Sequence, residues 1–274
     1  MADVLLMHRS DIDLKDLPKE RNLEQIWLFW HDEPCGVEKE LTDLQFNWTI
    51  SYRLNSEANL GAYGLTVLRR KALSHIELNS YINDEFDHRQ DNAIWFVSNC
   101  QPKARLNYYR ELVQSYSSIK VYGNCVNDMS KNSCHRQSQC EATELRTNKF
   151  YLAFESQSCR DYVTEKFWRS IVHGIIPIVF GPREKKSLER IAPPNSFIYT
   201  GDFSSAEKLA EYLREVSGNR TLFGKYHRWR QFYEVLYRPE DIEHYRFCEL
   251  CYRLNRNAKK SFYRDLNKFF LEDC

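Results

Sequence analysis

The chain has 274 residues, of which 42% are hydrophobic, so it is long and apolar enough to bury a large core and is neither a disordered tail nor a fibrous protein. Its 39 basic and 38 acidic side chains leave a formal net charge of +1, which argues against a nucleic-acid-binding surface over the whole protein and leaves room for a local basic pocket. It contains no run of 18 apolar residues and no signal peptide, so we expect a soluble chain without a targeting segment, whose membrane anchor, if any, lies outside this sequence.

Residues 1–90 predict one structural unit. Strand-like apolar runs occur at residues 4–7, 26–30 and 48–50, and the helical signals between them are less regular. A polar stretch follows at residues 83–92. Because so many charges in ten residues bury little surface, we expect this stretch to be a linker between two units.

Residues 91–236 predict a second unit, a doubly wound α/β domain, because short apolar runs alternate there with amphipathic stretches. Five of the apolar runs are typical of buried strands: residues 93–97, 119–122, 150–154, 175–180 and 197–199. Pro177 lies in the fourth run. It is awkward for a central strand, because proline has no N–H to donate.

The amphipathic stretches predict the helices that cover this sheet. Four are expected: one beginning near Pro102, one at residues 161–173, one at residues 183–191 and one beginning at Ser204. In the fourth, Glu207 completes a capping box and Gly218 ends the helix. Residues 237–274 are rich in tyrosine and arginine and are expected to form a C-terminal helical tail.

The densest group of chemically active residues runs from Tyr151 to Lys166, off a buried strand and into the start of a helix. In α/β sheets, ligands lie at the carboxyl ends of strands, where helix N-termini offer unpaired N–H groups to anions. Glu165 and Lys166 fall in the first turns of this helix. A lysine there is unfavourable for the helix dipole unless an anion is near, which favours a phosphate ligand. The alternative is that both are solvated charges on a helix face.

The cysteine content and two sequons indicate the cellular compartment of the protein. Nine cysteines are many for a cytosolic protein. The N-glycosylation sequons at Asn47 and Asn219 favour the same interpretation, an oxidising secretory compartment.

Residues 151–168, with residues 176–182 after them, closely resemble the donor-binding motif of the α1,3-fucosyltransferases of glycosyltransferase family 10, which use GDP-fucose. Other segments share the resemblance in chain order: residues 46–49, 52–53, 95–99, 104–105, 108–109, 194–197, 202–203, 209–210, 228–230 and 248–251. Because several separated motifs agree, the chain is identified as a member of this family.

The resemblance implies a GT-B architecture, in which two Rossmann-like domains face a cleft and the second domain holds GDP. It implies that Arg105 and Lys166 neutralise the departing diphosphate, a task for cations in a site without a metal. Glu165 would accept hydrogen bonds from the ribose hydroxyls. Tyr151 and Tyr162 would line the nucleotide pocket or, alternatively, only pack in the core. No metal site and no required cofactor is expected, because the chain has no Asp-x-Asp arrangement in a donor-site loop.

One residue of the motif departs from the family pattern. Ser156 follows Glu155, where the family usually has asparagine. A hydroxyl cannot present the paired donor and acceptor of an amide, so the nucleotide contact of the family is not expected in the same form here.

An inverting transfer also needs a carboxylate that takes the proton of the acceptor hydroxyl. The family has its base in a Glu-Ser-Pro segment after a tryptophan-rich strand, and residues 27–34 occupy that place one residue short. We therefore expect Glu33 to be the base, with Asp32 as its competitor. His31 beside them is expected to be a neutral loop histidine, because nothing in the sequence orients it.

Six cysteines are candidates for disulfides. Four lie in or just before the donor-binding motif: Cys125, Cys134, Cys140 and Cys159. We expect them to form two local disulfides beside the nucleotide site, with three connectivities open. For Cys248 and Cys251 a structural disulfide is favoured over a zinc site, because no second pair of cysteines or histidines has matching spacing.

Family members carry an anchor, a stem, a first strand and cysteines that partner the terminal Cys-x-x-Cys, all before a segment that residues 2–8 resemble. This chain starts at that segment. We therefore expect an incomplete acceptor-side domain with an exposed sheet edge, alternative pairing of Cys248 and Cys251, and reduced activity.

The leading hypothesis is an inverting α1,3-fucosyltransferase of the Golgi lumen, acting on a GlcNAc residue of a glycoprotein or glycolipid glycan. Residues 161–167 and the cysteine-rich loop favour the branch that modifies the N-glycan core, and full-length relatives are single-pass type II membrane proteins. The expected partners are GDP-fucose and the glycan, with no nucleic acid. One alternative is a non-catalytic nucleotide- or glycan-binding remnant, favoured by the missing start and Ser156. Another is a transferase for a different nucleotide sugar.

Overall fold

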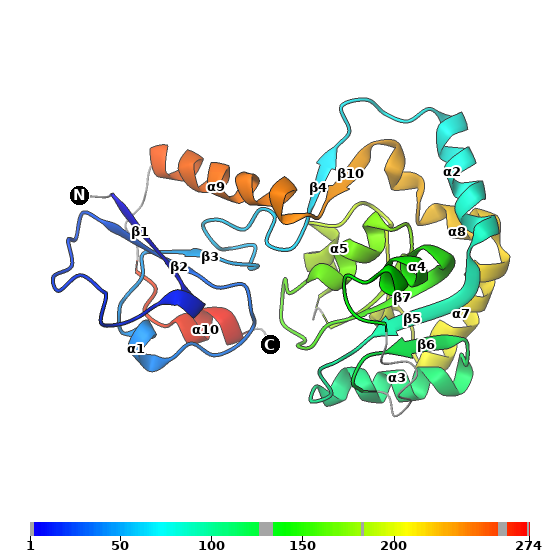
Figure 1. Ribbon diagram of the computed structural model, residues 1–274, viewed down its shortest axis with the longest axis horizontal. Helices are drawn as coiled ribbons and strands as arrows, with labels where there is room; N and C mark the ends of the chain where they lie inside the picture. The colour runs from blue at the N-terminus through cyan, green and yellow to red at the C-terminus, as the bar shows by residue number, and fades with distance from the viewer. Residues whose placement is uncertain (1–2, 126–133, 182–183, 257–261, 273) are drawn as a thin grey trace.

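The computed structural model describes residues 3–125, 134–181, 184–256, 262–272 and 274. Two parallel sheets form the centres of two lobes, which lie at the left and the right of Figure 1. A long helix, α9 (Pro239–Asn255), runs from the second lobe back across the first. The chain therefore crosses twice between the lobes.

The first lobe is built on three parallel strands, β1 (Val4–His8), β2 (Ile26–Trp30) and β3 (Trp48–Ile50), in the order β1-β2-β3. Strand β2 is buried at its first four positions because both faces of the sheet are covered. Phe270 of α10 (Leu266–Leu271) packs on one face and Leu250 of α9 on the other. The short helix α1 (Lys39–Thr42) adds Leu41 to the first of these cores.

The second lobe is built on five parallel strands in the order β6-β5-β7-β8-β9. Their bounds are β5 (Gln90–Phe96), β6 (Ile119–Tyr122), β7 (Asn148–Phe154), β8 (Ile176–Phe180) and β9 (Ile198–Tyr199). The chain moves outward from β5 to β6 and then returns past β5 to β7. The strand order therefore reverses between β5 and β7, and this is the switch point where α/β sheets bind ligands.

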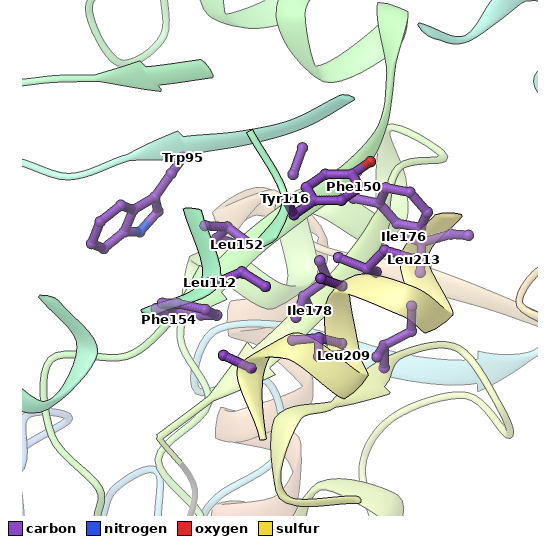
Figure 2. Packing of buried hydrophobic residues seen from close by; sticks show 14 of the residues in the cluster. Trp95, Leu112, Tyr116, Phe150, Leu152, Phe154, Ile176, Ile178, Leu209 and Leu213 are labelled. Carbon is purple, nitrogen blue, oxygen red and sulfur yellow. The ribbon is translucent and has the colours of Figure 1, made fainter. Parts of the chain in front are cut away.

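Helices cover both faces of this sheet. One face carries α3 (Lys103–Ser115), α7 (Ala206–Gly218) and α8 (Arg220–Lys225). Figure 2 shows Phe150 and Phe154 of β7 in one buried cluster with Leu209 and Leu213 of α7. The other face carries α4 (Gln139–Thr147), α5 (Glu165–Val172) and α6 (Lys185–Glu189). The expected doubly wound α/β arrangement is confirmed.

Smaller elements complete the described chain. Strands β4 (Leu65–Leu68) and β10 (Tyr233–Leu236) form an antiparallel pair between the lobes. Three 3₁₀ helices lie at Arg9–Asp11, Thr200–Asp202 and Arg228–Gln231. Among the described residues, no helix has the length and apolarity needed to cross a membrane.

The polar stretch at residues 83–92 is not a linker, so that prediction is wrong. It forms the end of α2 (His75–His88) and the start of β5. Helix α2 begins in a capping box made by Ser74 and Glu77, and it buries Leu78 and Ile82. Its charges are tolerated because they lie on the outer face of an amphipathic helix.

Two helix starts also differ from expectation, and the place of Pro177 inside a strand has a simple reason. Helix α5 begins only at Glu165, because Thr164 is its N-cap. The N-cap of α7 is Ser205, whose side chain accepts from the N–H of Lys208, and not Ser204. Pro177 fits inside β8 because at its position only β7 is paired; the pairing with β9 begins at Ile178.

The described cysteines pair differently from the sequence expectation. Cys134 does bond to a cysteine of the expected group, Cys140, but Cys125 bonds to Cys100 and Cys159 bonds to Cys274. Cys248 and Cys251 are free and exposed, so their predicted structural disulfide is wrong. Both lie on the exposed surface of α9, three residues apart, and neither is bonded to the other or to another described cysteine.

The two sequons have opposite environments. Asn47 is 1% exposed, and its side-chain oxygen accepts from the N–H of Trp27 and from the guanidinium of Arg21. A glycan cannot be attached to a side chain in this position, so the prediction for Asn47 is wrong. Asn219 is exposed at the N-cap of α8, and its glycosylation stays a prediction.

Candidate active site

A cavity of about 380 Å³ opens at the switch point of the five-stranded sheet. It is lined by residues that directly follow three adjacent strands: Ser98 and Asn99 after β5, Gly123 and Asn124 after β6, and Ser156 after β7. The start of α5 closes it, with Glu165 and Lys166 in its lining. The position offers the partial positive charge of a helix N-terminus to an anion.

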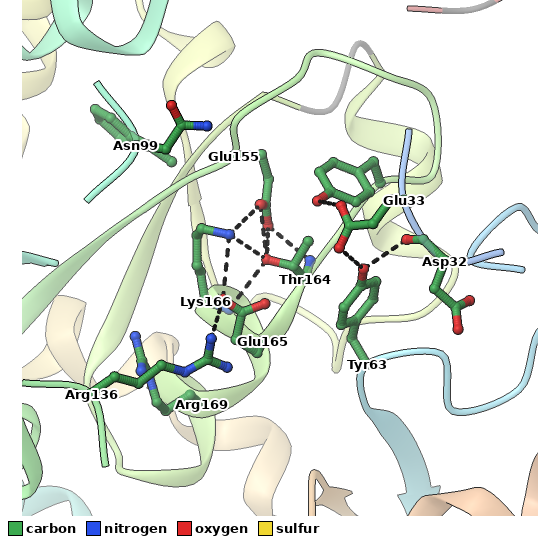
Figure 3. A network of polar contacts seen from close by, with 12 residues as sticks. Asp32, Glu33, Tyr63, Asn99, Arg136, Glu155, Thr164, Glu165, Lys166 and Arg169 are labelled. Atoms are coloured by element: carbon green, nitrogen blue, oxygen red, sulfur yellow. Dashed lines mark hydrogen bonds and ion pairs between the residues drawn. The ribbon is translucent and has the colours of Figure 1, made fainter. Parts of the chain in front are cut away.

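A network of charges and hydroxyls organises this helix start (Figure 3). The carboxylate of Glu155 accepts from the N–H of Thr164 at 2.8 Å and from the ammonium of Lys166 at 3.1 Å. The Lys166 ammonium also lies 2.8 Å from the hydroxyl of Thr164 and 3.5 Å from Glu165. The side chains of Lys166 and Glu165 are only 18% and 21% exposed, so they are not solvated charges on a helix face.

Burial and pairing act in opposite directions in this network. Burial works against the charge of Lys166, but the carboxylates of Glu155 and Glu165 raise its pKa above the ordinary value. Burial raises the pKa of Glu155, and Lys166 and the N–H of Thr164 oppose that rise. Three donors surround the Glu155 carboxylate: the ammonium of Lys166 and the N–H and hydroxyl of Thr164. We therefore describe Glu155 and Lys166 as an ionised carboxylate and an ammonium.

Two arginines are held rigidly beside the cavity. Arg105 is 4% exposed and donates to the carbonyl oxygens of Phe154, at 3.1 Å, and Asn99, at 2.6 Å. Burial lowers the pKa of Arg105. Arg169 donates to Glu141 at 2.5 Å and to the hydroxyl of Tyr151 at 2.7 Å.

The cavity lining has more cationic than anionic side chains. Four are cationic and two are carboxylates: Arg105, Arg136, Lys166 and Arg169 against Glu141 and Glu165. Arg169 is paired with Glu141, and Lys166 is paired with Glu155 and Glu165. Arg136 shares the carboxylate of Glu165, at 3.7 Å, with Lys166, and Arg105 is bonded to neutral carbonyls. An incoming anion therefore meets Arg105 and Arg136 as the least compensated cations.

The two predicted tyrosines lie in different places. Tyr151 is fully buried, and its ring lines the cavity beside Arg169. Tyr162 is also buried, but its hydroxyl donates to the carboxylate of Glu33 at 2.8 Å. Tyr162 thus connects the donor-binding motif of the second lobe to the first lobe.

The candidate base is held by two phenols. Besides Tyr162, Tyr63 donates to Glu33, at 3.0 Å, and also to the backbone oxygen of Asp32, at 2.7 Å. Burial raises the pKa of both Tyr63 and Tyr162, so both remain protonated donors. Glu33 is itself exposed, whereas Figure 3 shows the Asp32 side chain turned away from it.

Asp32 is occupied elsewhere. Its two carboxylate oxygens accept from Arg246 of α9 at 2.7 and 3.0 Å, and the indole N–H of Trp30 donates to it at 2.7 Å. His31 is buried, and its pKa is lowered to about 4 by burial and then by the charge of Arg9. It is neutral at physiological pH, as expected from the sequence.

Several contributors to the site were not among the predicted residues. Glu155 was noted only as part of the motif, although it is the buried partner of Lys166. Arg136 follows Cys134, and that spacing is the only sequence signal that could have placed it beside the site. Tyr63 and Arg246 belong to no motif that we recognised. Their roles could not be predicted because they depend on contacts between segments that are distant in the sequence.

Each disulfide holds a wall of this region. Cys100–Cys125 joins the loops that carry Asn99 and Asn124, and Cys134–Cys140 holds the loop of Arg136. Cys159–Cys274 attaches the donor-binding motif to the end of the chain, which packs with the first lobe through α10. Tyr162 lies three residues after Cys159, so this bond helps to keep its hydroxyl at Glu33.

Removing the Cys159–Cys274 bond is expected to cost more stability than removing Cys134–Cys140. The two bonds close loops with sequence separations of 115 and 6 residues. The chain-entropy relation gives losses of about 5 and about 2 kcal/mol in the free energy of unfolding. Urea unfolding of the double alanine variants, Cys159→Ala with Cys274→Ala and Cys134→Ala with Cys140→Ala, checks this. Equal losses would contradict the assignment.

Within the described residues, no group of three or more histidine, cysteine, aspartate or glutamate side chains is arranged to hold a metal ion. The acidic residues of the donor cavity are instead paired with arginine or lysine. The residue chemistry there suits an anion.

Comparisons with known proteins agree in both lobes. A family model described as glycosyltransferase family 10 (fucosyltransferase) C-term matches residues 86–269, and one described as fucosyltransferase, N-terminal, matches residues 1–64. The α-(1,3)-fucosyltransferase C of Drosophila melanogaster is 30% identical over all of this chain, which spans 66% of that relative. A human 3-galactosyl-N-acetylglucosaminide 4-α-L-fucosyltransferase is 31% identical over 98% of this chain, which spans 72% of it.

Solved structures share the fold. A crystal structure of an α1,3-fucosyltransferase with GDP-fucose superposes with a TM-score of 0.57 and 18% identity, covering 84% of this chain and 70% of that one. A structure with GDP gives a TM-score of 0.54 and 16% identity. The architecture of this chain is therefore the GT-B fold, as expected.

Proposed function

Because the chain belongs to glycosyltransferase family 10, the fucosyltransferases, we propose that it is an inverting α1,3-fucosyltransferase. It moves fucose from GDP-fucose to the 3-hydroxyl of a GlcNAc residue in a glycoprotein glycan. The observation that carries this proposal is the contact between Tyr162 and Glu33. This contact puts an exposed carboxylate of the first lobe next to the motif that borders an anion-binding cavity in the second.

In the proposed reaction, the carboxylate of Glu33 takes the proton of the acceptor hydroxyl as its oxygen attacks the anomeric carbon of fucose. The new oxygen–carbon bond forms on the face opposite the diphosphate, and the carbon–oxygen bond to the β-phosphate breaks. The electron pair of that bond leaves with GDP. Arg105, Lys166 and the start of α5 stabilise the charge that develops on the leaving diphosphate.

The other donor contacts follow from the lining of the cavity. The carboxylate of Glu165 accepts from the ribose hydroxyls, and the ring of Tyr151 forms part of the nucleotide pocket. The hydroxyl of Ser156, at the end of β7, offers one hydrogen bond where the family has an amide.

Arg136 is a further diphosphate contact in this proposal, and its replacement by glutamine is expected to weaken GDP binding by about 10-fold. Guanosine has no phosphate, so its affinity should not change. Calorimetry with both ligands measures the difference. Arg146→Gln, an exposed change on α4 outside the cavity lining, is the matched control. An equal loss for guanosine and GDP would mean that Arg136 acts only by holding Glu165 at the ribose.

The proposed mechanism needs no divalent metal, because cations of the chain stabilise the leaving group. EDTA is therefore expected to leave the rate of fucose transfer within about twofold of its starting value. A twofold change in rate corresponds to a change of less than about 1 kcal/mol in the activation free energy. Complete loss of activity that manganese restores would contradict this mechanism.

The acceptor is assigned by class. The N-glycan core is proposed because the loop held by Cys134–Cys140 and the motif around Cys159 resemble the branch of the family that modifies it. A panel of nucleotide sugars and glycan acceptors, with linkage analysis of the product, tests the function. Transfer of fucose to the 3-position of GlcNAc supports it, and preference for another nucleotide sugar contradicts it.

Ser156 favours a second candidate, a remnant that binds nucleotide or glycan without turnover. Such a chain would bind GDP in calorimetry and release no GDP from GDP-fucose in the presence of acceptor. The same panel therefore separates the two functions.

We propose the Golgi lumen as the location. Three disulfides and the exposed sequon at Asn219 suit an oxidising, glycosylating compartment. Attachment to the membrane would require an anchor outside the described helices.

A further inference from the structure

The second lobe buries a histidine whose ring has no hydrogen-bond partner. His227 is 2% exposed and joins α8 to the 3₁₀ helix Arg228–Gln231. Both of its ring nitrogens are buried, and neither is hydrogen-bonded within the described chain. Burial without a partner is unfavourable for a neutral imidazole and far more unfavourable for a charged one. The folded chain therefore holds His227 in its neutral form.

The imidazole packs between two helices. Its centroid lies 4.6 Å from the ring of Phe223 on α8 and 5.8 Å from the ring of Tyr81 on α2. Helices α2 and α8 contact each other at the outer side of the second lobe (Figure 1). His227 is thus part of the packing that joins α2 to the segment 220–231.

The charged groups closest to His227 are arginines. Arg230, on the 3₁₀ helix, and Arg89, at the end of α2, both oppose a positive charge on the imidazole. Arg230 lies over the ring of Tyr81, 5.0 Å from its centroid. The carboxylate of Glu85, on α2, is paired with Arg89. A proton on His227 would therefore add a third cation to a cluster whose carboxylate is already in use.

The other charges on the surrounding elements do not compensate for a proton either. Lys149 of β7, which lies 5.8 Å from the centroid of the Phe223 ring, is paired with Asp91. Burial raises the pKa of the Tyr81 phenol, which therefore adds no negative charge. Burial and then the two arginines lower the pKa of His227 well below its ordinary value. The remaining charged residues of α8 and the 3₁₀ helix are exposed cations: Arg220, which is paired with Asp87 of α2, Lys225 and Arg228.

The elements around His227 also hold the strand pair between the lobes. Strand β4 leads into α2, and the 3₁₀ helix leads into β10, which pairs with β4. Between them, the N–H groups of Arg69 and Leu73 donate to the carbonyl oxygens of Phe232, at 2.8 Å, and Gln231, at 2.9 Å. The guanidinium of Arg69 donates to the carbonyl oxygen of Arg230 at 2.8 Å. Separation of α2 from the 3₁₀ helix would therefore strain the bonds beside this strand pair.

We propose that His227 is an acid-sensitive latch of the second lobe. In its neutral form the ring packs between α2 and α8 and keeps both on the 3₁₀ helix. When the ring takes up a proton from the solvent, α2 separates from α8 so that the charge reaches water, and the β4–β10 pair loosens. The latch does not depend on the proposed function, because it concerns packing and protonation alone.

The pH range of the latch follows from the linkage between protonation and folding. A histidine in an unfolded chain has a pKa of about 6.5. The pKa of His227 in the folded chain is lower, so the unfolded or opened chain binds the proton first as the pH falls. The stability that the neutral ring provides is complete above about pH 6.5 and is lost progressively below it. The latch therefore opens on the acid side of neutrality.

His227→Phe tests the latch, because phenylalanine keeps an aromatic ring but cannot take up a proton. Urea unfolding at pH 7.5 and at pH 5.0 gives the unfolding equilibrium constants of both chains. The ratio of the wild-type constant to that of the variant should rise about 30-fold between the two pH values, as expected for one group with a pKa of about 6.5. The other buried histidines, His31 and His173, are present in both chains, so their effects cancel. A ratio that does not change with pH would overturn the latch.

Two further variants complete the unfolding experiment. His227→Leu also cannot take up a proton, and it should give the same rise in the ratio if the phenyl ring is too large for the site. His75→Gln is the control, because it removes an exposed histidine from α2. It should show the same pH dependence as the wild type. A pH-dependent ratio as large for His75→Gln as for His227→Phe would contradict the assignment to His227.

Hydrogen exchange measured by mass spectrometry tests whether the opening is local. In the wild type at pH 5.0, amides of α2 and β10 should be protected about 10-fold less than those of β7, which is buried at every position. Exchange in α2 and β10, relative to the same amides of His227→Phe, should rise by about 30-fold from pH 7.5 to pH 5.0. Equal protection of α2, β10 and β7 would mean that the lobe opens only by global unfolding, and would overturn the latch.

Discussion

Replacing Glu33 with glutamine is expected to lower kcat by about 10²–10⁴-fold and to leave the affinity for GDP unchanged. Glutamine keeps the shape of the side chain, and its single oxygen still accepts from one of the two phenols, Tyr63 or Tyr162, while its NH₂ group can donate to the other phenol oxygen. It cannot take the proton of the acceptor hydroxyl. Steady-state kinetics with GDP-fucose and acceptor, together with GDP calorimetry, give both quantities. A fall in GDP affinity as large as the fall in kcat would assign Glu33 to donor binding.

Asp32→Asn is the matched control. Asp32 makes an ion pair with Arg246, whose side chain is 5% exposed, so its neutralisation should mainly destabilise the fold. We expect a loss of about 1.5–3 kcal/mol in the free energy of unfolding and only a small change in kcat at a temperature where the variant is folded. An inactive but stable Asp32→Asn variant beside an active Glu33→Gln variant would reverse the two roles.

The two phenols that hold Glu33 come from different parts of the chain. Tyr162 belongs to the donor-binding motif, and Tyr63 precedes β4, the strand that pairs with β10 between the lobes. The base is therefore oriented by residues whose positions depend on how the lobes meet. Any change that moves the lobes is expected to change the orientation of Glu33 before it changes the donor cavity.

The strands of the second lobe could be predicted because their apolar runs are continuous. Strand β7 is buried at all seven positions, as expected for a central parallel strand covered on both faces. Helix α2 could not be predicted from its end alone. Residues 83–88 are mostly polar and contribute only Phe86 to the core, whereas the fully buried residues of the helix, Leu78 and Ile82, lie before them.

Long-range pairing explains the cysteine and sequon errors. Cys159 bonds to Cys274 across 115 residues, and no local pattern distinguishes that partner from Cys134 or Cys140. The sequon at Asn47 satisfies the local rule for glycosylation, but tertiary packing buries the side chain against β2. In both cases the deciding contact joins segments that are remote in the sequence.

The candidate site was predictable where one motif carries it. Residues 151–166 place Ser156, Glu165 and Lys166 at one cavity because they follow one strand and begin one helix. The partner that fixes Lys166, Glu155, lies in the same motif, but its burial depends on the fold of the loop between β7 and α5. Arg136 reaches the cavity from a different loop, so its charge could not be assigned in advance.

Lys166→Ala is expected to weaken GDP binding by about 10-fold or more and to destabilise the fold as well. The substitution removes a cation from the donor cavity and leaves Glu155, whose side chain is 1% exposed, without its ammonium partner. Breaking a buried pair in this way costs about 3 kcal/mol, the lower end of the usual range, since Thr164 still donates to the carboxylate. GDP calorimetry and urea unfolding measure the two effects.

The double variant Lys166→Ala with Glu155→Gln separates them. Glutamine removes the unpaired charge and still accepts from the N–H of Thr164, so stability should return toward the wild type while GDP binding stays weak.

The pH dependence gives an independent check. Burial already raises the pKa of Glu155, and loss of Lys166 raises it further. A carboxyl whose pKa is raised in the folded state stabilises the fold in its protonated form, and this contribution is lost as the pH rises through the folded pKa. The stability deficit of Lys166→Ala should therefore be small in mild acid and grow toward neutral pH, whereas the double variant should show no such growth. Recovery of GDP affinity together with stability in the double variant would mean that Lys166 only supports the start of α5 and does not contact the diphosphate.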